Sequence, residues 1–127
     1  MASQDPKDRP DPMTQTTMMV RPGWRPPGVA YKNFEQFYPF YLGEHSNRTC
    51  RRLHFIGTSL GIAAILHSLS TLDFRWLLGG LLAGYGCAWV GHFFIERNRP
   101  ATFTYPLYSF MGDWVMWKDI LIGKIGF

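Results

Sequence analysis

The sequence predicts an all-α fold: an integral membrane hairpin of two helices, flanked by amphipathic interfacial helices and preceded by a disordered tail. Two apolar runs, Leu53–Ser70 and Trp76–Ile95, contain no Asp, Glu, Lys or Arg. They are about 18 and 20 residues long, and about 17–25 helical residues cross a bilayer core. Charged residues make up 17% of the 127 residues, below the roughly 25% of an ordinary soluble domain. This composition favours a membrane protein with one domain.

Residues 1–30 differ from the rest of the chain in their proline content. Six prolines lie in this stretch: Pro6, Pro10, Pro12, Pro22, Pro26 and Pro27. The stretch has mixed charges and few aliphatic side chains, so it buries too little apolar surface to offset its ordering entropy. It lacks the apolar core of a secretory signal, and its aspartates do not fit a mitochondrial presequence. We therefore predict a disordered Pro-rich tail over 1–30 and a membrane helical domain over 31–127.

The short link Thr71–Arg75 between the two apolar runs predicts an antiparallel hairpin. Small residues allow close approach of the two helices. They are Gly57, Ser59, Gly61, Ala63 and Ala64 in the first run, and Gly79, Gly80, Ala83, Gly84 and Gly86 in the second. The alternative is a soluble helical pair inside a core. A chain of this size has too little other material to cover two helices that are apolar on all sides, so membrane insertion is favoured.

Arginines gather at one end of the predicted hairpin. They are Arg48, Arg51 and Arg52 before the first run, and Arg97 and Arg99 after the second. The link holds one arginine, Arg75, balanced by Asp73. Under the positive-inside rule both termini face the cytoplasm, whether the membrane is a bacterial inner membrane or the endoplasmic reticulum. The same arginines could also hold an acidic lipid headgroup or a carboxylate.

Two flanking segments read as interfacial helices. In Tyr31–His45, aromatic residues and a histidine recur at helical spacing, and Pro39 is expected to kink or split the helix. Thr104–Ile122 likewise carries Leu107, Phe110, Met111, Trp114 and Leu121 on one side. Tryptophan and tyrosine in both segments suit the headgroup level of a bilayer. For the second segment a third membrane span stays open.

All four histidines lie in the helical body: His45, His54, His67 and His92. Ionisable side chains inside membrane segments mark functional sites by default. With Asp73 as the apex of the hairpin, His54 and His92 stand at the same distance from it and hence at the same depth. His67 lies roughly 20 Å from His54 at about 1.5 Å per residue. We therefore expect His67 to make a polar contact elsewhere.

His45 can join His54 only if the helix breaks between them, since on one helix the two would stand about 13 Å apart. Ser46, Asn47 and Thr49 are capping residues directly before the apolar run, so a break is expected there. Asn47 would then cap the helix or point into the site. Glu96 follows His92 at i, i+4 spacing, on the same helix face.

Three imidazoles and a carboxylate at one depth suit a divalent transition metal, and two histidines with one carboxylate favour Fe(II) and oxygen chemistry. Haem held by two histidines stays an alternative. The two cysteines are too few for a disulfide scaffold. The chain has no Gly-rich phosphate loop, and its aromatic residues lie on membrane-facing segments. No nucleic-acid partner is expected.

Two motifs in these segments resemble a known family. The stretch Phe37–Gly57 is similar to a pattern of H-x-N followed by a second histidine, here His45, Asn47 and His54. Trp89–Ala101 looks like the pattern G-H-x-x-x-E-x-x-x-P, which here includes His92 and Glu96. Residues 106–117 are also similar to the family's C-terminal part. The family is that of the 2-hydroxy fatty acid dioxygenases of phytosphingosine-to-odd-chain-fatty-acid metabolism.

The resemblance implies an integral membrane enzyme that uses Fe(2+) and O2 to shorten a 2-hydroxy fatty acid by one carbon. It implies His45, His54 and His92 as metal ligands, Glu96 as a ligand or its neighbour, and Asn47 as a catalytic-site residue. A fatty acid in the cytoplasmic leaflet would place its carboxylate beside basic residues, of which Arg51, Arg52 and Arg97 are the candidates. The competing hypothesis is a non-catalytic small membrane protein that binds lipid, metal or haem.

Overall fold

A computed structural model describes residues 30–127, which contain helices, turns and short connections and no strand. The predicted all-α class is confirmed for this part of the chain. The tail predicted over 1–30 lies outside the described residues except for its last position. The chain divides into two compact units, residues 1–43 and residues 44–127.

The described part of the first unit is dominated by one helix, α2 (Phe34–Gly43). Asn33 begins the helix, since its Oδ1 accepts a hydrogen bond from the backbone N–H of Gln36 at 2.9 Å. Aromatic rings stack along one side, as the spacing predicts, with Phe34 and Tyr38 5.3 Å apart between centroids. The helix continues through Pro39, so the predicted split does not occur. It ends at Gly43, two residues short of the predicted end.

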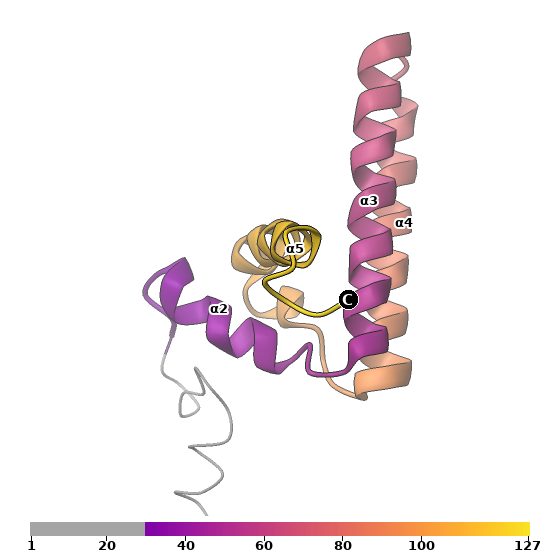
Figure 1. The fold of residues 1–127 in the computed structure, drawn as a ribbon. Helices are drawn as coiled ribbons and strands as arrows, with labels where there is room; N and C mark the ends of the chain where they lie inside the picture. Colours follow the sequence, from indigo (N-terminus) through magenta and orange to yellow (C-terminus); the bar gives the residue numbers. More distant parts are fainter. Residues whose placement is uncertain (1–29) are drawn as a thin grey trace, which may run out of the picture. The chain divides into compact units, whose positions relative to one another are not determined.

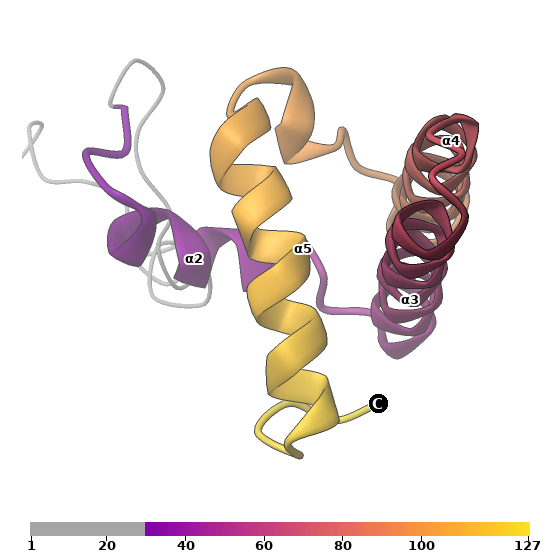
Figure 2. The same ribbon diagram turned by 90° about the horizontal axis from the view of Figure 1, so that it is seen from above.

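The second unit is built on the expected hairpin. Helix α3 (Arg48–Thr71) and helix α4 (Arg75–Val90) lie side by side and antiparallel (Figures 1 and 2), and a π-helix, η2 (Gly91–Glu96), continues α4. The turn between them takes Leu72 into the left-handed region, at φ 57°. The Arg75 guanidinium then pairs with the Asp73 carboxylate at 2.8 Å and holds the pKa of Asp73 below its ordinary value.

Small residues determine how closely the two helices approach. A Cβ at Gly80 would lie 2.6 Å from Cβ of Ala64, and one at Gly57 would lie 3.0 Å from the carbonyl oxygen of Gly84. A Cβ essentially never lies within 3.0 Å of such an atom, so glycine is required at position 80, and the tight 3.0 Å contact strongly favours it at position 57. The predicted close packing of the hairpin is therefore observed.

The outward faces of the hairpin are apolar and exposed. Among them Leu66 is 63% exposed, Leu78 61% and Leu82 66%. The helices Arg48–Thr71 and Arg75–Glu96 are long and apolar enough to cross a membrane. Within residues 30–127 only these two reach that length and apolarity. The second flanking segment is not one of them.

That second segment forms a short 3-10 turn, η3 (Ala101–Phe103), and helix α5 (Pro106–Leu121). Pro106 occupies the first turn of α5, where a backbone N–H has no acceptor within the helix, so the helix loses no hydrogen bond to proline. α5 runs across the hairpin rather than along it (Figures 1 and 2). The indole N–H of Trp117 donates to Oγ of Ser59 at 3.0 Å, and the same ring stacks on Phe55 at 6.0 Å. This arrangement agrees with an interfacial helix.

Candidate metal centre

Three histidine rings meet at the base of the hairpin, the end away from its turn, where α3 begins and α4 passes into η2. The ring centroids of His45, His54 and His92 lie 4.3, 4.5 and 4.9 Å apart. Nε2 of His45 and Nε2 of His54 are 3.0 Å apart. All three rings are at least 96% buried. Cys50 lies beside them, and one donor atom from each of the four residues falls within 4.8 Å of the others.

The register of the hairpin explains how His54 and His92 meet. Gly57 lies against Gly84 and Cys50 against Gly91, so the hairpin is centred a few residues before Asp73. Consequently His92 stands roughly 7 Å nearer the base than His54, at about 1.5 Å per residue. The prediction that His54 and His92 stand at the same depth is therefore wrong by about one helical turn. The rings still converge, because side chains lean toward the N-terminus of their own helix and the two helices run in opposite directions.

His45 reaches the other two rings because the chain breaks between α2 and α3, as predicted. Asn47 caps α3, with its Oδ1 accepting from the backbone N–H of Thr49 at 2.8 Å. The Glu96 carboxylate accepts hydrogen bonds from the Asn47 backbone N–H and the Ser46 hydroxyl. Arg51 donates to the carbonyl oxygens of His45 at 3.1 Å and Ser46 at 2.7 Å. These bonds fix the short loop that carries His45.

Hydrogen bonds to Nδ1 orient two of the rings. His54 Nδ1 donates to the Cys50 carbonyl oxygen at 3.0 Å, and His92 Nδ1 donates to Oδ1 of Asn98 at 2.7 Å. The Asn98 amide in turn donates to the Glu44 carboxylate at 2.8 Å and to the Glu44 carbonyl oxygen at 3.0 Å. With Nδ1 occupied in this way, the Nε2 lone pair of each neutral ring is available to a metal, which is how protein metal ligands are usually oriented.

Asn98 and Glu44 are absent from the sequence-based site. Asn98 reaches His92 because the wide turn of η2 curls the chain back, and its backbone N–H donates to the His92 carbonyl oxygen at 3.0 Å. A π-helix of this kind occurs often at functional sites. The spacing of a regular α-helix does not predict a π-helix, so the sequence analysis could not place Asn98 beside His92.

Residues 31–125 match the family described as 2-hydroxy-palmitic acid dioxygenase Mpo1-like. The chain belongs to this family. The match spans the rings and their hydrogen-bond partners, and it confirms the resemblance stated from the two histidine motifs. No curated protein and no solved structure matches the chain.

The donor set of this Mpo1-like chain fits a metal ion. Two nitrogen ligands of one ion, each about 2.0–2.1 Å from it, lie about 3 Å apart when they are adjacent, and the two Nε2 atoms of His45 and His54 are 3.0 Å apart. Imidazole suits zinc, copper, iron and nickel. The buried His and Cys group could therefore hold a metal ion. Its ligands suit iron, and they suit the other three metals as well.

The other predicted site residues lie around the three rings or away from them. Glu96 and Asn47 lie next to the His45 loop, where they hold the backbone. Arg51 also donates to the Gly126 carbonyl oxygen at 3.2 Å, and Arg52 lies over the Phe127 ring at 5.1 Å. Arg97 is exposed at the end of η2, with φ 55°. His67 stays apart from the three rings, as expected, and packs edge-on against Trp76 at 4.5 Å.

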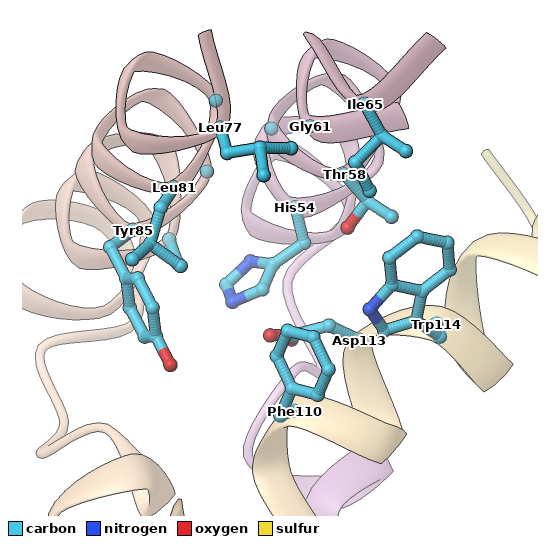
Figure 3. Close-up of a pocket in the computed structure, with 14 residues that line it drawn as sticks. His54, Thr58, Gly61, Ile65, Leu77, Leu81, Tyr85, Phe110, Asp113 and Trp114 are labelled. Carbon is cyan, nitrogen blue, oxygen red and sulfur yellow. The ribbon is translucent and has the colours of Figure 1, made fainter. Parts of the chain in front are cut away.

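A groove of about 190 Å³ opens beside His54, between the hairpin and α5 (Figure 3). Most of its lining is apolar: Gly57, Gly61, Ile65, Leu77, Gly80, Leu81, Gly84, Ala88, Phe110 and Trp114. Thr58, Tyr85 and Asp113 complete it, and Asp113 lies below the His54 ring. The candidate metal centre is thus next to an apolar space.

Proposed function

We propose that this protein is a membrane-bound, Fe(II)-dependent dioxygenase that acts on 2-hydroxy fatty acids. The observation that carries the proposal is the buried group of His45, His54 and His92 in a chain of a dioxygenase family. The overall reaction would convert a 2-hydroxy acid and O2 into the acid one carbon shorter, CO2 and water. The C1–C2 bond breaks, and O2 accepts all four electrons, so no further reductant is needed.

Iron(II) held by the three histidines would supply redox chemistry with O2 and coordination for substrate oxygen atoms. The chain's own residues prepare the site. The Cys50 carbonyl oxygen and the Asn98 side chain hold the Nδ1 protons of His54 and His92. Glu96 and Arg51 hold the loop that carries His45. Burial of the rings keeps bulk water away from them.

The substrate carboxylate needs a cationic partner, and we propose Arg97 for it. Arg51 and Arg52 already donate to backbone oxygen atoms, whereas Arg97 is exposed directly before Asn98. Replacement Arg97→Gln should raise KM for the 2-hydroxy acid and leave the metal content unchanged. Loss of metal in this variant would contradict the assignment.

We further propose that both helices of the hairpin cross the membrane with both termini on the cytoplasmic side. Their exposed leucines and their length support insertion. The arginines at the base, compared with the single Asp73–Arg75 pair at the tip, support the orientation. A cysteine introduced at position 72 should react with an impermeant thiol reagent only from the non-cytoplasmic side.

The decisive experiment is metal analysis of the purified full-length protein, followed by anaerobic Fe(II) reconstitution and measurement of O2 uptake with 2-hydroxy fatty acids. His54→Ala and His92→Ala should lose both metal and uptake. His67→Ala is the matched control, since His67 lies outside the cluster, and it should retain both. Bound metal without uptake would indicate a non-catalytic metal protein, and a Soret band would indicate haem. Absence of any transition metal would overturn the proposal.

A further inference from the structure

The apolar groove beside His54 runs along the hairpin between residues of α3 and α4. We propose that it holds the acyl chain of the substrate, with the 2-hydroxy acid group at the three histidines, and that Gly61 determines how long a chain fits. The identity of the head group rests on the proposed function. The position of the chain rests on the groove itself.

The groove follows one face of α3 away from the metal centre. His54, Thr58, Gly61 and Ile65 all line it, and their spacing places them on the same side of a helix. Opposite them, α4 contributes Leu77 and other apolar residues, and α5 closes the end near His54 (Figure 3). The polar lining residues His54 and Asp113 stand together, while Ile65 and Leu77 lie at the far end. This polarity matches a molecule with a polar head and an apolar tail.

The length of the groove corresponds to a long acyl chain. From His54 to Ile65, α3 advances about 16 Å at about 1.5 Å per residue. An extended alkyl chain, with C–C bonds of about 1.5 Å, advances about 1.3 Å per carbon. The groove therefore accommodates about 13 carbons beyond the head group, and Gly61 lies near the eighth of them.

Gly61 differs from the glycines that join the helices. A Cβ at Gly57 or Gly80 would press on the opposite helix, at 3.0 Å or less. A Cβ at Gly61 would approach only the Gly80 carbonyl oxygen, at 4.0 Å. Helix packing therefore does not require glycine at position 61. Its effect is to leave the middle of the groove open, so a larger side chain there would occupy the path of the acyl chain.

The test uses the full-length protein and a series of 2-hydroxy acids of increasing chain length. Gly61→Leu should weaken binding of chains longer than about ten carbons by about tenfold, because the added side chain overpacks the space that the acyl chain fills. It should leave the binding of shorter chains and the metal content unchanged. Gly79→Leu is the matched control, since a Cβ at Gly79 meets no atom within 4 Å and Gly79 does not line the groove. It should bind the whole series like the parent protein.

A second measurement locates the chain without relying on metal or turnover. A 2-hydroxy acid with a photoreactive diazirine at its far end should label Ile65 or Leu77, and unlabelled 2-hydroxy acid should compete while excess phospholipid should not. Labelling outside the groove, labelling removed by phospholipid, or equal length profiles for the two leucine variants would overturn the inference. Groove labelling in a protein that binds no metal would refute the proposed function and leave the acyl site standing.

Discussion

Replacement of Asn98 tests how the candidate metal centre is held. Its Oδ1 accepts the Nδ1 proton of His92 at 2.7 Å, and its amide donates to the side chain and the backbone of Glu44. Removal of a hydrogen-bond partner behind a metal-bound histidine typically lowers metal affinity 10- to 100-fold. Asn98→Ala should therefore raise the Kd for Fe(II) by about that factor, or about 1.4–2.7 kcal/mol, with all three imidazoles still present.

The assay is anaerobic competition for Fe(II) against a chromophoric chelator, with thermal unfolding recorded on the same preparation. Asn33→Ala is the matched control, because the Asn33 side chain caps α2, outside the unit that carries the three rings. It should lower stability by about 1 kcal/mol and leave the Kd unchanged. If Asn98→Ala binds Fe(II) as tightly as the parent protein while His92→Ala does not, the Asn98 hydrogen bond does not orient His92.

Three further predictions concern packing and the His45 loop. Gly80→Ala should lower the free energy of unfolding by about 1–3 kcal/mol, since its Cβ would lie 2.6 Å from a side-chain carbon of α3, whereas Gly79→Ala should be neutral or stabilising in the same denaturation assay. Glu96→Gln should retain metal because it keeps a hydrogen-bond acceptor for the loop, whereas Glu96→Ala should lose metal affinity about tenfold by titration. Arg51→Lys should lower both stability and metal affinity more than Arg52→Lys, since a lysine cannot reproduce the guanidinium's three bonds to backbone oxygen atoms.

The convergence of the histidines could be predicted from the sequence because it depends on coarse features. Two apolar runs joined by a short link must run antiparallel, which brings His54 near His92. Capping residues before the first run break the chain, which frees His45 from the preceding helix. Neither inference depends on an accurate register. The register itself, shifted by about one turn, is set by contacts such as Gly57 against Gly84, and these depend on the detailed fit of two surfaces.

The hydrogen-bond partners of the rings could not be predicted in the same way. Helical spacing assumes i to i+4 hydrogen bonds, and under that assumption Glu96 belongs on the face of His92. The chain instead widens into a π-helix over Gly91–Glu96, which directs Glu96 to the His45 loop and returns Asn98 to His92. Gly91, the first residue of this π-helix, packs directly on α3, since a Cβ there would lie 2.9 Å from Sγ of Cys50.

The positions of the three rings depend more on hydrogen bonds than on packing in an apolar core. The described residues bury few large apolar side chains, and the leucines of the hairpin face outward. Packing of that kind cannot by itself hold side chains from a loop, a helix and a π-helix within a few ångströms. The side chains of Arg51, Glu96 and Asn98 hold these segments in place, because each makes hydrogen bonds to a segment that is distant in sequence. Because the outward-facing leucines take no part in these hydrogen bonds, substitutions at Arg51, Glu96 or Asn98 should affect metal binding before they affect the hairpin.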